Sequence, residues 1–207
     1  MRITGGLYRN VELKTLAGEL TRPTSSKVRS AVMNMLTGLI QDAVFFDFFS
    51  GSGAMSFEAL SRGAKKAYLY EKDQKAARVI RENIKMLTSK FGALSAELVC
   101  ADVFDLLKQP PKKHSHQMSL DKSIVFKEAD IVWMDPPYAL VIDWVQILMQ
   151  FLEASKNSRK QVFVLESSID DLSKIIEMFE NCTLIERSRH KKYGATAVFI
   201  FETRMKE

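Results

Sequence analysis

The chain has 207 residues, of which 46% are hydrophobic, and a formal net charge of +5. This length predicts one domain, or one domain with a small extension, and the hydrophobic content is sufficient for a sizeable core. The moderate positive charge permits a polyanionic partner without requiring one. No apolar run reaches membrane-spanning length, residues 1–10 lack the apolar core of a signal peptide, and the two cysteines offer no metal spacing. We therefore expect a cytoplasmic, monomeric protein with no bound metal and no membrane contact.

Glycines and basic residues punctuate residues 1–24, which we expect to form a basic arm or small β-hairpin before a main domain over residues 25–207. Within that domain, short apolar runs alternate with helical patterns. The periodicity predicts strands over 43–50, 66–73, 96–102, 130–135 and 161–167, helices over 25–40, 53–63, 74–91, 140–155 and 170–180, and two further strands within 182–203. Residues 108–128 are too long and too polar for an ordinary connection, and we interpret them as a mobile insertion loop.

Strands that are apolar throughout and alternate with helices indicate a parallel sheet covered on both faces. No helix separates the last two strands, so we expect them to pair antiparallel. The predicted fold class is α/β and Rossmann-like, with seven strands that are mostly parallel and an antiparallel last strand.

The segment "DFFSGSGAMSFEAL" (47–60) predicts a ligand site. A buried strand ends at Asp47 to Ser50, and Gly51 and Gly53 then turn the chain directly into a helix, whose first N–H groups are free. A dinucleotide fingerprint would place a third glycine where Ser56 stands, which weakens the interpretation as a nicotinamide or flavin site. The acidic Asp47 suits a ligand with an ammonium group better than one with a pyrophosphate.

Acidic residues also follow the next two predicted strands. Glu71 is placed to accept both hydroxyls of a ribose, and Asp102 to accept from an adenine amino group. Adenosine joined to a cationic amino-acid tail describes S-adenosylmethionine. The alternative is a plain Rossmann-like scaffold in which these acids only cap helices or face solvent.

The segment "DPPY" follows the fourth predicted strand, at Asp135, Pro136, Pro137 and Tyr138. The two prolines impose a rigid, extended turn, from which the Asp135 carboxylate and the Pro136 carbonyl can point at one spot. Two converging acceptors suit an amino group with two hydrogens, and Asp135 can also accept the proton that leaves after methyl transfer. Tyr138 offers a flat face on which an unpaired or flipped-out base stacks. An ordinary proline turn is the alternative.

Taken with "RITGGLYRN", "RPTSSKVRSAVMNML" and "VLES", the glycine turn and "DPPY" make the chain resemble the RsmD family of bacterial 16S ribosomal RNA guanine-N2 methyltransferases. The resemblance implies a class I S-adenosylmethionine-dependent methyltransferase that modifies one guanine near the P-site loop. Its implied partner is 16S rRNA, the 30S subunit or an assembly intermediate. The implied cofactor residues are Gly51, Gly53, Glu71 and Asp102, and the implied amine-binding residues are Asp135, Pro136 and Tyr138. The long segment 108–128 departs from the family pattern.

Basic residues gather near both ends of the chain, where they are candidates for holding RNA phosphates. The candidates are Arg2, Arg9, Arg22, Lys27, Arg29, Arg189, Lys191 and Lys192. Solvated surface charge is the alternative for individual members of this set.

Other functions stay open at this point. A DNA adenine-N6 methyltransferase would use the same turn, although no separate DNA-recognition domain is evident. A non-catalytic rRNA-binding assembly factor on a methyltransferase scaffold would require a damaged cofactor segment or a damaged turn. A nicotinamide-dependent enzyme leaves Asp135 to Tyr138 unexplained.

Overall fold

The structure is a computed structural model that describes residues 1–16, 24–108, 128–154 and 159–204. The chain divides into two compact units, Met1–Asp102 and Val103–Glu207. The predicted arm residue Arg22 lies outside the described residues, as do residues 109–127 of the insertion loop predicted over 108–128. Within the described ranges, no helix is both long and apolar enough to cross a membrane.

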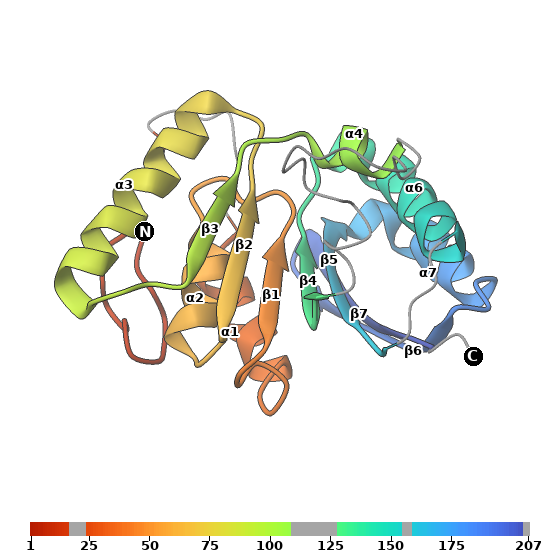
Figure 1. Cartoon of the computed structure of the whole chain (residues 1–207). Coiled ribbons are helices and arrows are strands. Elements are labelled where there is room, and N and C mark those ends of the chain that lie inside the picture. Colours follow the sequence, from red (N-terminus) through yellow and green to blue (C-terminus); the bar gives the residue numbers. More distant parts are fainter. Residues whose placement is uncertain (17–23, 109–127, 155–158, 205–207) are drawn as a thin grey trace. The chain divides into compact units, whose positions relative to one another are not determined.

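The first unit is built on three parallel strands in the order β3-β2-β1, which lie side by side in Figure 1. Its elements are α1 (Ser26–Met35), β1 (Val44–Asp47), α2 (Ala54–Ser61), β2 (Lys66–Tyr70), α3 (Gln74–Phe91) and β3 (Ala96–Val99). The N-terminal residues join this unit through one antiparallel bridge between Arg2 and Glu12 and through its core.

The core of the first unit lies on one face of β2. Ala67 and Leu69 of β2 contact a cluster of buried side chains from α2, α3 and the N-terminal segment. That cluster contains Ile3, Tyr8, Val11, Leu13, Phe57, Leu60, Ile80 and Leu87. The alternate residues of the strands carry aromatic rings, and Phe46 stacks on Tyr68 at a centroid distance of 4.7 Å. The centres of β1 and β2 are therefore apolar on both faces, which is why their sequences do not alternate between polar and apolar residues.

Residues 3–14 are held against the helices by hydrogen bonds as well as by packing. The backbone N–H of Leu7 donates to the Ser61 carbonyl at 2.7 Å, and that of Tyr8 donates to the Ser61 hydroxyl at 2.8 Å. Gly6 has a φ of +76°, and a Cβ at that position would lie 1.8 Å from the Ser61 carbonyl oxygen. Only glycine allows the segment to approach α2 this closely.

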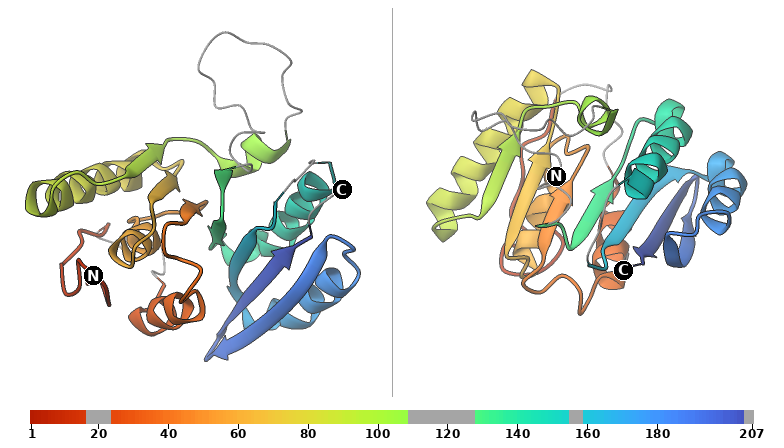
Figure 2. Two further views of the ribbon diagram at one scale, coloured as in Figure 1. Left: turned by 60° about the horizontal axis from the view of Figure 1, so that its bottom comes forward. Right: turned by 45° about the vertical axis from the view of Figure 1, so that its right-hand side comes forward.

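The second unit holds four strands in the order β4-β5-β7-β6. Strands β4 and β5 are parallel, whereas β7 is antiparallel to both β5 and β6. Its elements are α4 (Val103–Lys108), β4 (Ile131–Met134), η1 (Tyr138–Leu140), α6 (Val141–Ala154), β5 (Val162–Ser168), η2 (Ile169–Asp171), α7 (Leu172–Glu180), β6 (Ile185–Tyr193) and β7 (Thr196–Thr203). Figure 2 shows β6 and β7 as a long hairpin in this unit.

Aromatic contacts join the sheet and helices of the second unit. Phe163 of β5 stacks on Phe201 of β7 at 5.1 Å, and Phe179 of α7 contacts Phe201 at 4.6 Å. Phe104 of α4 meets Trp144 of α6 edge to face at 5.1 Å. Strand β6 differs from the other strands, because every residue from 186 to 192 is exposed. It pairs only with β7 among the described strands, so it forms an edge of the sheet.

The predicted fold class is confirmed. Each predicted helix and strand is present, although several strands are shorter than predicted: the strand expected over 43–50 ends at Asp47, and the one expected over 96–102 ends at Val99. Both predictions ran past the strand end because apolar or small residues continue into the turns. Helix α4 was not predicted, since its six residues are too few to establish a helical period.

Candidate functional site

The glycine turn between β1 and α2 is fixed by its own backbone. The Ser50 N–H donates to the carbonyl of Tyr70 at 3.1 Å, which ties the turn to the end of β2. The Ser50 hydroxyl donates to the Asp47 carbonyl at 2.8 Å, and the Gly53 N–H donates to the Ser50 carbonyl at 2.7 Å. Ser50 therefore shapes the turn that the sequence predicted.

The two glycines of the turn have different roles. Both have positive φ, +53° at Gly51 and +80° at Gly53. A Cβ at Gly53 would lie 2.7 Å from Phe57 and 2.9 Å from Leu69, so this glycine is required for α2 to pack on β2. A Cβ at Gly51 would meet nothing within 4 Å. The open space beside the backbone therefore lies at Gly51, and a side chain at Gly53 would strike the core rather than fill a ligand pocket.

Glu71 lies directly after β2 and joins the turn. Its Oε2 accepts from the Gly51 N–H at 2.8 Å, and its Oε1 accepts from the Asp73 N–H at 2.8 Å. Burial raises the pKa of Glu71 above its usual range, while these backbone hydrogen bonds oppose the rise. Each carboxylate oxygen can accept more than one hydrogen bond, so this held carboxylate can still take ribose hydroxyls.

Asp47 lies beneath the turn rather than at its surface. Its side chain is buried, and its Oδ2 accepts from the Ser56 hydroxyl of α2 at 2.8 Å. This contact explains why serine stands where a dinucleotide fingerprint has glycine. Ser56 holds the carboxylate at the base of the helix, which a glycine could not do.

Asp102, the last residue of the first unit, lies three residues beyond the end of β3. Its Oδ2 is 2.9 Å from Lys72 Nζ, and both side chains reach solvent. An exposed ion pair of this kind contributes at most about 1 kcal/mol. The carboxylate can therefore exchange this partner for a ligand at small cost.

Asn83 was not predicted as a site residue. It is fully buried on α3, where its Nδ2 donates to the carbonyls of Ser52 and Lys14 at 3.1 and 3.0 Å, and its Oδ1 accepts from the Lys14 N–H at 2.8 Å. One amide thus connects the glycine turn to the N-terminal segment. The available signal was an asparagine at the helical spacing of Ala76, Ile80 and Leu87, all of which are buried.

In the second unit, the "DPPY" segment forms the predicted rigid turn after β4. Pro137 is extended, with φ −50° and ψ 133°, and its carbonyl accepts from the Leu140 N–H at 2.8 Å to begin η1. Asp135 is half-buried and Pro136 is buried. The Tyr138 hydroxyl lies 3.2 Å from Thr196 Oγ1 of β7. Tyr138 is thereby positioned by the sheet, a role for its hydroxyl that the sequence did not reveal.

The predicted RNA-binding residues fall into two groups. Arg2, Arg9 and Lys27 are exposed in the first unit, and Arg189, Lys191 and Lys192 are exposed on β6. Arg29 is different, because it is buried and all its described contacts are internal. We leave it out of the RNA-binding set.

Arg29 belongs to a buried charge cluster around Glu58 of α2. Its Nη1 and Nη2 donate to the carbonyls of Thr24 and Arg2, both at 2.8 Å, and its Nε lies 3.6 Å from Glu58. Glu58 also accepts from the Thr4 N–H at 2.7 Å and lies 3.6 Å from Arg62. Burial lowers the pKa of Arg29, and the negative charge of Glu58 opposes that shift. The cluster holds the N-terminal segment and α1 to α2.

The sequence and the fold were compared with those of known proteins. The chain matches the family described as conserved hypothetical protein 95 over residues 1–202. It is 34% identical over 138 residues to Ribosomal RNA small subunit methyltransferase D of Haemophilus influenzae, a match that covers 67% of this chain and 64% of the relative, slightly less than two thirds of it. It is 25% identical to "Putative rRNA methyltransferase YlbH" of Bacillus subtilis, over 99% of this chain and 100% of the relative. A solved structure described as "Putative methyltransferase yhhF from Escherichia coli" is 24% identical, with a TM-score of 0.71 over 100% of this chain and 99% of that chain.

The fold is the one found in solved structures of class I methyltransferases. The match over residues 1–202 is more specific and shows that the chain belongs to the conserved hypothetical protein 95 family. This result agrees with the predicted resemblance to the RsmD proteins.

Proposed function

We propose that the protein transfers a methyl group from S-adenosylmethionine to the exocyclic N2 amine of a guanine in 16S ribosomal RNA, either in free RNA or in the small subunit or its precursors. The observation that carries the proposal is the Glu71–Gly51 contact beside open space, together with the rigid turn at Asp135. The names of the relatives support the substrate class. The cofactor supplies an electrophilic methyl group, and the residues of this chain bind, orient and deprotonate.

The first unit supplies the cofactor site. Glu71 accepts the ribose hydroxyls through the lone pairs that Gly51 and Asp73 leave available. Asp102 accepts from the adenine amino group after releasing Lys72. Gly51 leaves room for the ligand next to the backbone. Asp47 is buried under the turn, where its negative charge favours the cationic amino-acid part of the cofactor over an anionic ligand.

The second unit supplies the amine site. The N2 lone pair of guanine is delocalised into the ring, so the amine is a poor nucleophile. The Asp135 carboxylate and the Pro136 carbonyl accept hydrogen bonds from its two N–H groups, which makes the nitrogen more tetrahedral and directs its lone pair outward. Once this nitrogen has received the methyl group that the cofactor would supply, the Asp135 carboxylate would accept the proton that the nitrogen loses. Tyr138, held by Thr196, stacks on the base.

A direct test measures transfer of labelled methyl from S-adenosylmethionine to 30S particles, free 16S RNA and duplex DNA in parallel, followed by nucleoside analysis. We expect N2-methylguanine in the particle or the RNA. Methyladenine in DNA would keep the cofactor site and overturn the substrate assignment. Cofactor binding without transfer to any substrate would favour the non-catalytic assembly factor.

The role of Asp135 has a matched control in the same unit. Asp135→Asn keeps the shape but removes the proton acceptor, so we expect turnover to fall by about 10²- to 10⁴-fold with cofactor affinity unchanged. Asp143→Asn changes an exposed aspartate on α6 and should leave turnover unaltered. Equal turnover in the two variants would refute the role of Asp135.

Strand β6 is the proposed RNA-binding surface of the second unit. Replacing Lys191 and Lys192 by glutamine removes two exposed charges, so the slope of log affinity against log salt should decrease by roughly 1.4 to 1.8. The control is Lys85→Gln on α3, which should change the slope by less than half as much. An unchanged slope in the double variant would mean that these lysines are solvated surface charges that do not contact RNA phosphates.

A further inference from the structure

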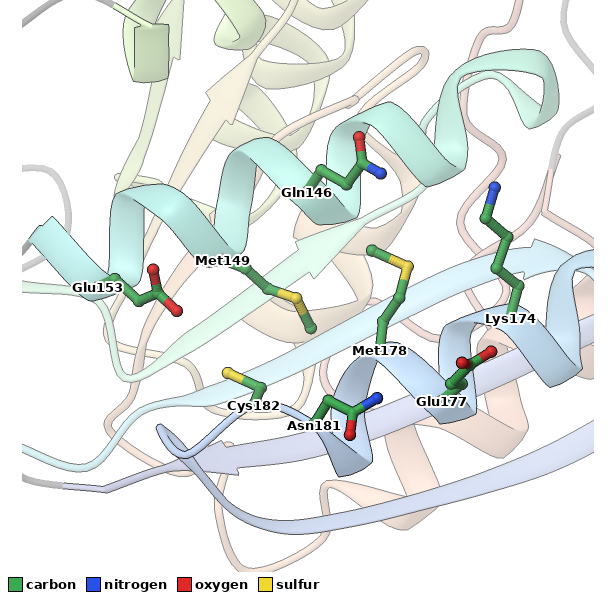
Figure 3. A pocket seen from close by; sticks show the side chains of 8 residues that line it. All are labelled: Gln146, Met149, Glu153, Lys174, Glu177, Met178, Asn181 and Cys182. Carbon is green, nitrogen blue, oxygen red and sulfur yellow. The ribbon is translucent and has the colours of Figure 1, made fainter.

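The second unit contains a groove that the methyl-transfer chemistry does not use. It lies between α6 and α7 and has a volume of about 400 Å³. In Figure 3, Met149 of α6 and Met178 of α7 turn their sulfur atoms into the space between the helices, with Cys182 below them. Glu153, Glu177 and one basic residue, Lys174, lie at its margins.

The floor of this groove suits an apolar side chain. Met149, Met178 and Cys182 are each partly buried, so the groove is open but shielded. Methionine is unbranched and polarizable, and methionine-lined surfaces adapt to apolar side chains of different shape. The other lining residues are polar, namely Gln146, Glu153, Lys174, Glu177 and Asn181, so an apolar side chain would be held by Met149, Met178 and Cys182 alone.

The charge around the groove has the opposite sign to the charge of the protein. Segments 141–154 and 169–182, which contain α6, η2 and α7, carry six acidic residues against one lysine, a net charge of −5. The whole chain has a net charge of +5. Residues 186–192 of β6, in the same unit, carry four lysines or arginines against one glutamate. The second unit is thus basic along its edge strand and acidic along α6, η2 and α7.

The separation of acidic and basic surfaces indicates which kind of ligand the groove can bind. A polyanion such as RNA is repelled by the helical surface, whereas a cationic group is attracted to it. The surface combines an acidic margin with an adaptable apolar floor, which complements an amphipathic segment with basic residues on one face and large apolar residues on the other.

We propose that the groove between α6 and α7 binds a cationic amphipathic peptide segment of a protein partner. An apolar side chain enters between Met149 and Met178, and lysine or arginine side chains pair with Glu153 and Glu177. The proposal does not depend on the methyl-transfer function, because none of these residues lies in the cofactor turn or the "DPPY" turn.

The test uses the full chain and a synthetic amphipathic peptide of about 18 residues, with leucines on one face and lysines on the other. Titration calorimetry should give saturable binding in the micromolar range for this peptide and none for the same peptide with glutamates in place of the lysines. The double variant Glu153→Lys and Glu177→Lys should lose at least about tenfold in affinity, which corresponds to roughly 1.4 kcal/mol. The matched control is Glu180→Lys, an exposed residue of α7 outside the groove, which should lose less than about threefold.

The apolar contact is tested separately. Met178→Gln keeps the size of the side chain but makes it polar, and it should lower the affinity for the lysine peptide at least about fivefold. In a Cys100→Ser background, which removes the exposed thiol, the lysine peptide should also slow alkylation of Cys182. The proposal is overturned if the two peptides bind equally, if neither binds at about 100 μM, or if the double charge variant binds as wild type does. Methyl transfer to RNA serves as the independent readout and should be unchanged in all these variants.

Discussion

Replacing Glu71 by glutamine tests the cofactor site at its most specific contact. The carboxylate accepts from two backbone N–H groups, at Gly51 and Asp73, both at 2.8 Å. A glutamine amide has one oxygen and one NH₂ group, so one of these N–H groups would face a donor. The ribose hydroxyls would also lose an ionised acceptor. A hydrogen bond to a charged group contributes about 1.5–3 kcal/mol, so we expect cofactor affinity to fall roughly 10- to 100-fold.

The assay is titration calorimetry with S-adenosylmethionine and with its demethylated product. Glu97→Gln is the control, because Glu97 is exposed on β3 of the same unit and pairs only with Lys66 among its described contacts, at 2.8 Å. That variant should retain affinity within about twofold, and thermal unfolding should confirm that both variants fold. An affinity loss below about threefold in Glu71→Gln would mean that the ribose lies elsewhere.

Three further predictions concern the same unit. Glu58→Ala leaves the buried Arg29 without its counter-charge and should lower the free energy of unfolding by about 3–5 kcal/mol. Urea denaturation measures this loss, and a value below about 1 kcal/mol would contradict the stabilising role of the cluster. Asn83→Ala removes the hydrogen bond to the Ser52 carbonyl of the turn and should lower the free energy of unfolding by about 1–3 kcal/mol. It should also lower cofactor affinity; unchanged affinity would show that Asn83 supports only the fold. Because burial raises the pKa of Glu71, this carboxylate takes up a proton at higher pH than an exposed glutamate. Cofactor affinity should therefore fall as the pH is lowered through this raised pKa. Over the same range the contribution of Glu71 to the free energy of unfolding should rise, because the folded state binds the proton more tightly than the unfolded state does. An affinity that stays flat until the ordinary glutamate range would contradict this reasoning.

The sequence was sufficient for the fold because the β1, β2 and β4 segments are mostly apolar and the helices between them are periodic. It was also sufficient for the glycine turn, since two glycines between a buried strand and a helical pattern are typical of a tight strand-to-helix connection. It could not predict that Gly53 is required for packing whereas Gly51 lies beside open space. That distinction depends on Phe57 and Leu69, which come near Gly53 only when α2 packs on β2.

Polar residues in the core were the main difficulty for prediction. Arg29 looks like one more basic residue in a basic region, and its burial follows only from Glu58, which lies 29 positions further along the chain. Asn83 lies on the buried face of α3, but its partners Ser52 and Lys14 are distant in sequence. Composition alone assigns such residues to the surface, because charged and amide side chains are rarely buried unless they are paired.

The attachment of the N-terminal segment has a consequence for how the protein is made. Ile3, Tyr8, Val11 and Leu13 are buried only when α2 and α3 are in place, and those helices extend to Phe91. During synthesis the segment leaves the ribosome while the residues that will cover it have not yet been joined to the chain. Its apolar side chains must remain exposed for that interval, and its contacts form only at large sequence separation, which slows folding. This part of the molecule is made first, yet its apolar side chains can be buried only after the chain has been made as far as α3.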